Sequence, residues 1–220
     1  MRIYLIGVTG AGFSVHCTLL RQGVNIYGYL DDRIRENEYH ELKYSGDISR
    51  DSIAESAKEQ SSKFITAIGS EKNFYRRSQK LASLGIPEES NYNVISNQSI
   101  LETSPQKVGS GVIVLDQAFV GYSVVLGNNV LINAMAYIGH ESFIDNSTII
   151  GPNVTIAGNV IIGKDCYLGA GSTVKNHIKI CDQVLVGCGS VVVKDIIFPG
   201  IYVGNPARLL CTLEEFIARK

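Results

Sequence analysis

The sequence of 220 residues predicts a small α/β domain followed by a parallel β-helix. The main observation is a repeat of six residues that runs without interruption from Gly109 to Phe198. The sixth position of every block is aliphatic or aromatic: Val114, Val120, Leu126, Ile132, Ile138, Ile144, Ile150, Ile156, Ile162, Leu168, Val174, Ile180, Val186, Val192 and Phe198. An α-helix repeats its apolar positions about every 3.6 residues and a half-buried strand about every two, so a period of six indicates a β-helix.

The second observation is an alternation of strands and helices in the first part of the chain. Apolar residues 2–8 (RIYLIGV) predict a strand, and residues 14–23, after the glycine loop GVTGAG, predict a helix. Residues 25–30 and 63–69 predict two further strands, and residues 73–85 predict a second helix. This order favours a small doubly wound parallel sheet, which binds ligands at the carboxyl ends of its strands.

The rest of the chain is divided by the start and the end of the repeat. Residues 85–110 are polar, and we expect a connector with one short strand (NVIS). Three hexads make one triangular coil, so the repeat predicts five coils around a narrow aliphatic core. Pro199 and Gly200 end the repeat, and residues 212–220 (TLEEFIARK) predict a short helix that covers the open end. The predicted domains are residues 1–92 and 93–220.

Composition excludes several classes of protein. The chain is 45% hydrophobic and 19% charged with a net charge of −1, so no basic excess indicates nucleic acid as a partner. No apolar run approaches the roughly 18 residues of a membrane span, and we interpret the apolar start as a first strand rather than a signal peptide. The five cysteines show no paired spacing, which favours buried thiols in a reducing cytoplasm over disulfides or a metal cluster.

The glycine loop and the residues after the second predicted strand indicate a nucleotide site. Gly7, Gly10 and Gly12 do not fit the G-x-G-x-x-G pattern of dinucleotide-binding proteins. A glycine loop before a helix can nevertheless present backbone N–H groups to a phosphate, and Asp31 or Asp32 can bind a ribose hydroxyl. The alternative is that these glycines only permit close packing.

Only four histidines are available for proton transfer or metal binding. His16 and His40 lie outside the repeat, and we expect packing or surface roles for them. His177 stands beside two lysines and is expected to be a solvated corner of the β-helix. His140 is the strongest candidate for catalysis, because an imidazole titrates near neutral pH and can accept a proton from a substrate.

The repeat predicts which residues surround His140. Residues eighteen apart stack directly above one another, so His140 should lie in one column with Gly158 and Asn176. These neighbours leave a groove suited to an extended ligand. Glu141 follows His140 at a corner, where the turning backbone allows its carboxylate to orient the imidazole. A second column contains Pro152, Ala170 and Cys188.

Six motifs show a resemblance to a known family. GVTGAG, YLDD, AIGS, NAMAYIGHE, IAGNVIIGKDCYLGAGS and VGNPARLL occur in this order over nearly the whole chain. In these motifs the sequence resembles the bacterial nucleotide-sugar acetyltransferases, which include sialic-acid O-acetyltransferase-like proteins and N-acetyltransferases of UDP-, dTDP- and GDP-linked 4-amino-4,6-dideoxysugars. The resemblance implies a Rossmann-like first domain, a left-handed β-helix and a homotrimer. It also implies that acetyl-CoA, the co-substrate, binds between the β-helices of adjacent subunits without any metal.

The resemblance assigns roles to individual residues. It implies His140 as the general base, Glu141 as the acid that raises its basicity, and Asn133 as a residue near the reacting group. The implied nucleotide-sugar residues are Thr9, Gly10, Ala11, Asp31, Asp32 and Gly69. The implied acetyl-CoA residues are Ile149, Ala170 and Cys188.

Three positions depart from the pattern of the family. Relatives commonly have a second histidine where this chain has Ile149, so this side chain cannot donate a hydrogen bond to the acetyl group. Relatives usually have G-H-G where this chain has Gly10-Ala11-Gly12, and a basic or aliphatic residue in place of Phe13.

The predicted function is acetyl-CoA-dependent N-acetylation of a nucleotide-linked 4-amino-4,6-dideoxysugar, by direct attack with His140 as the base, in bacterial surface-glycan biosynthesis. One alternative is O-acetylation of a sugar hydroxyl, as on a sialic acid. A second is a zinc-dependent lyase or hydratase, which needs three converging histidines where the repeat offers two. A third is a nucleotide-binding scaffold without catalysis.

Overall fold

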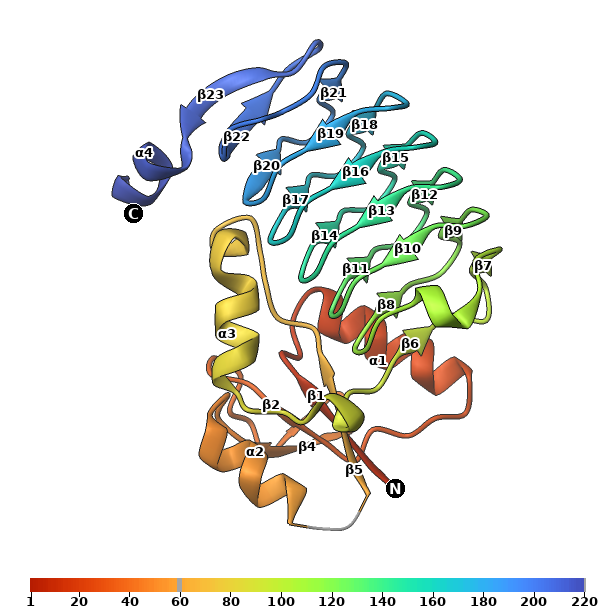
Figure 1. Ribbon diagram of the computed structural model, residues 1–220. Coiled ribbons are helices and arrows are strands. Elements are labelled where there is room, and N and C mark those ends of the chain that lie inside the picture. The colour runs from red at the N-terminus through yellow and green to blue at the C-terminus, as the bar shows by residue number, and fades with distance from the viewer. Residues whose placement is uncertain (59–60, 220) are drawn as a thin grey trace.

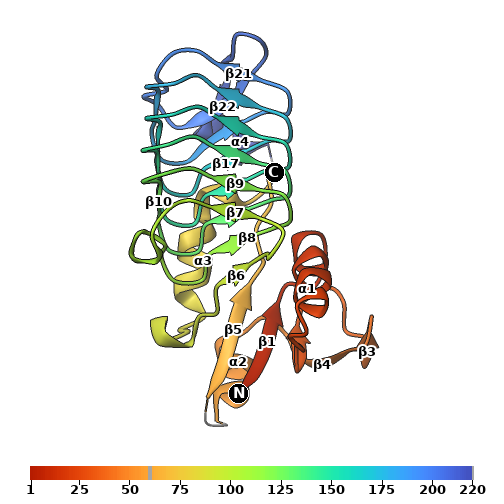
Figure 2. The same cartoon turned by 90° about the vertical axis from the view of Figure 1, so that its right-hand side faces the viewer.

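The computed structural model describes residues 1–58 and 61–219. An α/β domain lies against one side of a β-helix (Figure 1). The coils of the β-helix stack regularly, with the strands of each side above one another (Figure 2). Both parts of the predicted fold class are therefore confirmed.

The N-terminal domain is built on a five-stranded sheet with the order β3-β4-β2-β1-β5. Its elements are β1 (Arg2–Ile6), α1 (Ala11–Arg21), β2 (Gly28–Leu30), β3 (Glu38–Tyr39), β4 (Leu42–Gly46), α2 (Arg50–Ala57), β5 (Ser62–Thr66) and α3 (Arg77–Ser83). β1 pairs in parallel with both β2 and β5. The carboxyl ends of these three strands therefore lie together at one edge of the sheet.

Three elements of this domain are absent from the sequence prediction. β3 and β4 form an antiparallel hairpin, and β4 adds to the sheet beside β2. α2 buries only Ile53 and Ser56. These segments are short and polar and have weak apolar periodicity, which is the main signal of secondary structure in a sequence.

Gly12 permits α1 to begin directly against the end of β1. A Cβ atom at this position would lie 1.8 Å from the carbonyl oxygen of Gly7. The helix begins at Ala11, earlier than residue 14 as predicted. Close packing, the alternative weighed for these glycines, is thus one of their roles, although Gly7 and Gly10 also line the pocket described below.

The β-helix has three sheets, whose strands are parallel except for β23, which pairs antiparallel with β22. The domain-facing sheet contains β6 (Val94–Ile95), β8 (Ile113–Val114), β11 (Leu131–Ile132), β14 (Ile149–Ile150), β17 (Tyr167–Leu168), β20 (Val184–Val186), β22 (Gly200–Val203) and β23 (Arg208–Thr212). The second sheet contains β7 (Ile100–Leu101), β9 (Phe119–Val120), β12 (Tyr137–Ile138), β15 (Thr155–Ile156), β18 (Thr173–Val174) and β21 (Val191–Val192). The third sheet contains β10 (Val125–Leu126), β13 (Phe143–Ile144), β16 (Ile161–Ile162) and β19 (Lys179–Ile180).

Three edges separate these sheets. Two are called after a residue on them, His140 or Cys188, and the third is called after α3, which lies against it. The histidine edge joins the second and third sheets and contains Tyr122, His140, Gly158 and Asn176. The helix edge joins the third and domain-facing sheets and contains Asn129, Ser147, Asp165 and Gln183. The cysteine edge joins the domain-facing and second sheets and contains Pro152, Ala170 and Cys188. From β8 to β21 the strands pair with partners eighteen residues away, as in Ile132 with Ile150, so residues at that spacing stack.

The sixth positions of the repeat form the core, as predicted. From Val114 to Val192 all of them are buried in one aliphatic cluster. The prediction of a buried residue is wrong at the last position, because Phe198 is 66% exposed. Ile196 pairs with Ile180 in its place, only four residues after Val192.

The β-helix begins one coil earlier than predicted. β6, β7 and Val108, which pairs with Leu126, form a coil inside the segment interpreted as a connector. The domain boundary after residue 92 stays a prediction.

The C-terminal segment differs from the expected cap. α4 comprises Leu213–Ala218, and Thr212 caps its N-terminus through a capping box with Glu215. Phe216 packs against Phe74 and Tyr75, with ring centroids 6.1 and 6.4 Å apart. α4 therefore lies beside the segment before α3 and not across the open end (Figure 1). Residue 220, the last of the predicted helix, lies outside the described residues.

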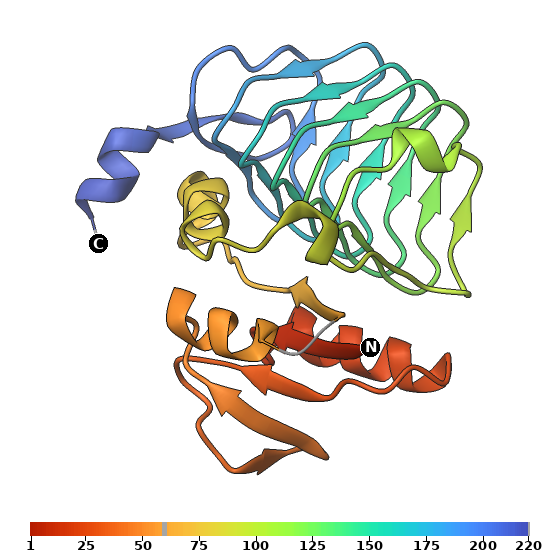
Figure 3. The ribbon, with the colours of Figure 1, turned by 60° about the horizontal axis from the view of Figure 1, so that its bottom comes forward.

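Apolar and polar contacts hold the two parts together. The outward side chains Ile113, Leu131 and Ile149 of the domain-facing sheet share one core cluster with residues of β1 and α1. Arg21 of α1 forms an ion pair with Asp116 on the β-helix. Figure 3 shows the N-terminal domain, red to yellow, against this side of the coils.

Candidate active site

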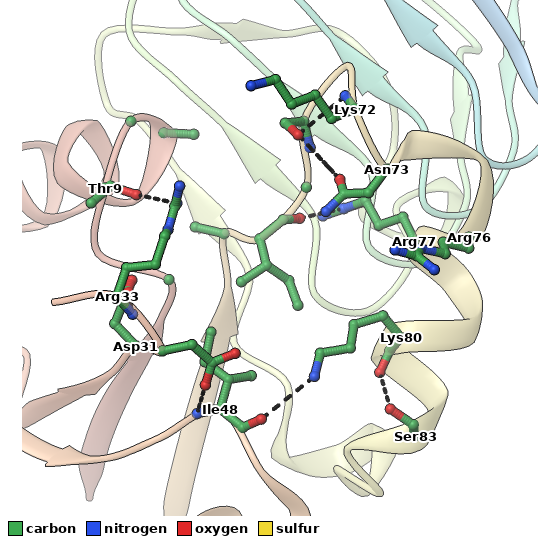
Figure 4. Close-up of a pocket in the computed structure, with 18 of the residues that line it drawn as sticks. Thr9, Asp31, Arg33, Ile48, Lys72, Asn73, Arg76, Arg77, Lys80 and Ser83 are labelled. Atoms are coloured by element: carbon green, nitrogen blue, oxygen red, sulfur yellow. Dashed lines mark hydrogen bonds between the residues drawn. The ribbon is translucent and has the colours of Figure 1, made fainter. Parts of the chain in front are cut away.

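A pocket with a volume of about 920 Å³ lies at the carboxyl ends of β1, β2 and β5, between the glycine loop and α3 (Figure 4). The structure brings all six predicted nucleotide-sugar residues to its wall: Thr9, Gly10, Ala11, Asp31, Asp32 and Gly69. Their sequence positions follow different strands, and the parallel pairing of the sheet is what places them together.

The pocket is rich in positive charge, which sequence reasoning missed. Arg33 donates from Nη2 to Thr9 Oγ1 at 2.9 Å, and Lys80 contacts the carbonyl oxygen of Ile48 at 3.5 Å (Figure 4). The cations on the wall are Arg33, Lys72, Arg76, Arg77 and Lys80, against the carboxylates Asp31 and Asp32. The signal available in the sequence was the group of basic residues in the predicted helix 73–85.

Asp31 and Asp32 differ in what they contact. Asp31 is 2% exposed, and its carboxylate accepts backbone N–H groups of Val8 at 3.0 Å, Arg33 at 2.8 Å and Ile34 at 3.1 Å. Asp32 is exposed, and among the described residues it accepts only the backbone N–H of Ile48, at 2.8 Å. Asp31 thus shapes the loops of the pocket, and Asp32 presents the freer carboxylate.

Arg77 is a buried cation held by backbone carbonyl groups. Its Nε donates to Ile68 at 2.7 Å, and a second nitrogen donates to Asn129 of the β-helix. Burial lowers the pKa of Arg77 to about 10, so the guanidinium stays charged at neutral pH. Gly69 lies against this side chain, because a Cβ there would be 2.8 Å from Arg77 Cδ.

His140 and Glu141 form the contact expected at a corner of the β-helix. Nδ1 of His140 lies 3.1 Å from Oε2 of Glu141, and the two side chains are 59% and 56% exposed. Glu141 has φ of 57°, so the backbone turns here and brings neighbouring side chains together. Since Nδ1 is engaged, Nε2 is the ring nitrogen left for proton transfer.

The His140 ring stacks over Gly158, one coil further along the histidine edge. A Cβ atom at Gly158 would lie 2.6 Å from Nε2 of His140. The predicted column is therefore present. Position 158 must be glycine for the imidazole to lie where it does, because any Cβ atom there would clash with the ring.

The other predicted site residues lie elsewhere in the protomer. Asn133 is at the cysteine edge and donates from Nδ2 to the carbonyl oxygen of Ile150 at 2.9 Å. Ala170 and Cys188 stack on the same edge, and Cys188 is exposed. Ile149 is 4% exposed, and its Cδ1 would lie 2.8 Å from a Cβ atom at Gly69. It is buried between the domains and does not join Ala170 and Cys188.

His140 and the pocket lie on opposite sides of one protomer. The pocket belongs to the domain that packs on the domain-facing sheet, and the histidine edge is the edge that joins the other two sheets. The cysteine edge borders the domain-facing sheet. On that sheet, burial and then the nearby charges of Glu71 and Cys188 raise the pKa of Tyr167.

Exposed apolar residues flank the histidine edge. Phe119 and Tyr137 stack on the second sheet with ring centroids 4.9 Å apart. The large exposed apolar side chains on this edge and its two sheets include Ile100, Tyr122, Tyr137, Phe143, Ile161 and Val193. On the third sheet Phe143 pairs with Ile161, and large exposed apolar side chains that gather on one part of a surface are typical of a protein–protein contact.

The remaining features concern metal, cysteines and membranes. Within residues 1–58 and 61–219, no three His, Cys, Asp or Glu side chains converge as a metal site would require. The five cysteines are free thiols; Cys166 and Cys211 are buried, whereas Cys188 is exposed, so the expectation of buried thiols is wrong for Cys188. No helix in the described part of the chain has the length and apolar character needed to cross a membrane.

Two family models match the chain in the order that the fold suggests. The PglD N-terminal domain matches residues 2–81, and the bacterial transferase hexapeptide model (six repeats) matches residues 141–176. A Rossmann-like pocket domain followed by hexapeptide coils, together with the similarity to the acetyltransferase domain of PglB, indicates an acyltransferase. The two models and the similar solved structures together support assignment to the nucleotide-sugar acetyltransferases with a left-handed β-helix.

Solved structures share this two-part fold. The acetyltransferase domain of PglB from Neisseria gonorrhoeae, in complex with acetyl coenzyme A, is 26% identical with a TM-score of 0.81, covering 95% of this chain and 98% of that one. PerB from Caulobacter crescentus, in complex with CoA and GDP-perosamine, is 24% identical with a TM-score of 0.81 and coverages of 96% and 98%. WeeI from Acinetobacter baumannii is 21% identical with a TM-score of 0.81 and coverages of 96% and 100%. No curated protein matches the chain.

Proposed function

We propose that the protein transfers the acetyl group of acetyl-CoA to the amino group of a nucleotide-linked 4-amino-4,6-dideoxysugar in surface-glycan biosynthesis. The pocket suits such a substrate, because cations on its wall match a diphosphate and Asp32 can accept a hydrogen bond from the nucleoside. The similar structures of the PglB domain and PerB were determined with acetyl coenzyme A and with CoA and GDP-perosamine, respectively.

The observation that supports this proposal most is the His140–Glu141 pair stacked over Gly158. Because this pair lies opposite the pocket of its own protomer, it can serve only the pocket of a neighbour. The exposed apolar residues beside it favour such a neighbour. We therefore propose a homotrimer in which each site combines His140 of one protomer with the pocket of the next.

Acetyl-CoA would lie between adjacent β-helices, with one side on the cysteine edge. Ala170 and Cys188 stack one coil apart there and leave room for an extended arm. Asn133 is on the same edge, nearer to the reacting end. Ile149, buried beneath Gly69, would support the loop of Gly69 rather than contact the coenzyme.

In the proposed reaction, the nitrogen of the sugar amine attacks the thioester carbonyl carbon, and His140 Nε2 accepts a proton from this amine. Glu141 holds Nδ1 and stabilises the imidazolium that forms. Backbone N–H groups stabilise the oxyanion. The C–N bond forms, the C–S bond breaks, and the imidazolium returns the proton to the thiolate, so the products are the acetamido sugar and CoA.

Product analysis tests this function directly. We expect purified protein with acetyl-CoA to add one acetyl group to a member of a mixture of UDP-, dTDP- and GDP-linked amino-sugars, detected by mass spectrometry. The hydroxyl analogue of that sugar is the control in a thiol-release assay. Faster release with the hydroxyl analogue would instead support O-acetylation, and no transfer to any of these sugars would contradict both.

The other proposals follow from this function. Residues 1–92 would bind the nucleotide-sugar. Residues 93–220 would form the acyltransferase domain, which provides the histidine edge and the cysteine edge. The protein would act in the cytoplasm, where acetyl-CoA is available.

A further inference from the structure

A ladder of four residues runs along the helix edge of the β-helix. Asn129, Ser147, Asp165 and Gln183 are eighteen residues apart, and all have φ between 53° and 60°. They therefore occupy the same left-handed corner position in four successive coils, and the spacing of coils is about 4.8 Å.

Three residues of this ladder hold the segment that forms α3. Gln183 Nε2 donates to the carbonyl oxygen of Tyr75 at 2.6 Å. The carboxylate of Asp165 accepts the backbone N–H of Ser78 at 2.7 Å and also the Ser78 hydroxyl. The carbonyl oxygen of Asn129 accepts from Arg77, and its side-chain oxygen accepts from Thr66 Oγ1 at 3.2 Å.

The segment held in this way provides one wall of the pocket. Arg76, Arg77, Gln79, Lys80 and Ser83 of this segment line the cavity opposite Thr9 and Arg33 (Figure 4). α3 is only two turns long, and a helix this short is marginal in isolation. Its position therefore depends on what it contacts, and the ladder supplies polar contacts at three levels.

Asp165 makes the strongest of these contacts. It is 2% exposed, and both of its oxygens bind Ser78. A buried carboxylate with such partners is costly to remove, since the donors it leaves are unpaired. Asp165 touches neither the predicted substrate residues nor His140.

We propose that Asp165 is a positioning residue, which with Asn129 and Gln183 fixes α3 so that its cations face the diphosphate of the nucleotide-sugar. This inference rests on the proposed function. It means that the β-helix, besides forming the acetyl-transfer site, determines the geometry of the nucleotide pocket from outside that pocket.

Calorimetric binding of GDP, UDP and dTDP tests the proposal. Asp165→Gly removes both contacts while glycine tolerates φ of 53° without strain. We expect this variant to bind the best-bound nucleotide about tenfold or more weakly than the unaltered protein does. Its affinity for acetyl-CoA should stay within about twofold of that of the unaltered protein. Asp165→Asn should restore part of the loss, because its amide oxygen can still accept the Ser78 N–H. Gln117→Gly is the matched control at an exposed left-handed corner, where φ is 58°.

Unchanged nucleotide affinity in Asp165→Gly, or an equal loss of nucleotide and acetyl-CoA affinity, would overturn the proposal. Should that variant not fold, Gln183→Gly is judged by the same two criteria. If the unaltered protein binds none of the three nucleotides, the proposed function fails, and hydrogen exchange then decides the positioning role. Faster exchange in α3 of Asp165→Gly with unchanged coils would support it, and unchanged α3 exchange would refute it.

Discussion

Replacing His140 with alanine is expected to lower kcat by about 10²–10⁴-fold, the usual contribution of a general base. The physical reason is that Nε2 is the nitrogen left for proton transfer once Nδ1 is engaged by Glu141. Acetyl-CoA affinity should stay nearly intact, because the side chain acts on the amine and not on the coenzyme. Steady-state kinetics together with calorimetric titration of acetyl-CoA measure the two quantities separately.

His177→Ala is the matched control for this variant, since His177 is an exposed histidine at a corner of the same β-helix. Its turnover should equal that of the unaltered protein. A His140→Ala enzyme that retains turnover within a few-fold of the parent would contradict the assignment of the base.

The second large effect is expected at Gly158. A Cβ atom there would lie 2.6 Å from Nε2 of His140 and 2.8 Å from Cε1, so Gly158→Ala must displace the imidazole. A shift of about 1 Å in a reacting group costs on the order of 10²-fold in rate, and we expect a loss of that size in kcat. Because Gly158 lies outside the left-handed region of φ, alanine should not strain the backbone. Thermal unfolding should therefore change little.

Asn176→Ala, one coil further along the same column, is the control for this effect. The contradicting result is a Gly158→Ala enzyme with normal kcat, which would mean that the imidazole does not work from the observed position. A large fall in melting temperature would likewise count against it, by making the glycine a requirement of the fold rather than of the site.

The β-helix core was predictable because each coil places apolar side chains at the same core positions. An apolar residue every six positions fills the interior, as from Val114 to Val192. The first coil was not predicted, because Ile95, Leu101 and Val108 are separated by six and then seven residues. The extra residue falls at the turn Pro105–Lys107 and hides the period.

The site was predictable where a motif or a stacking rule applied. The column of His140 and Gly158 follows from the spacing of eighteen, and the loops with Thr9, Asp31 and Gly69 follow from the ends of parallel strands. The cations of α3 did not follow, because their direction depends on contacts of Tyr75, Arg77 and Ser78 with distant coils. The burial of Ile149 was missed because it too depends on contacts between segments far apart in the sequence, here between the β-helix and the N-terminal domain.

A subunit-mixing assay tests most directly whether one protomer's His140 serves the pocket of another. One parent has His140→Ala, and the other has Arg33→Glu with Lys80→Glu, which reverse charge in the pocket. Each parent alone should be inactive. For trimers reassembled from equal parts, we expect about a quarter of the unaltered activity, because each site needs an intact pocket and an intact neighbouring histidine. A mixture as inactive as its parents would show that the site lies within a single chain.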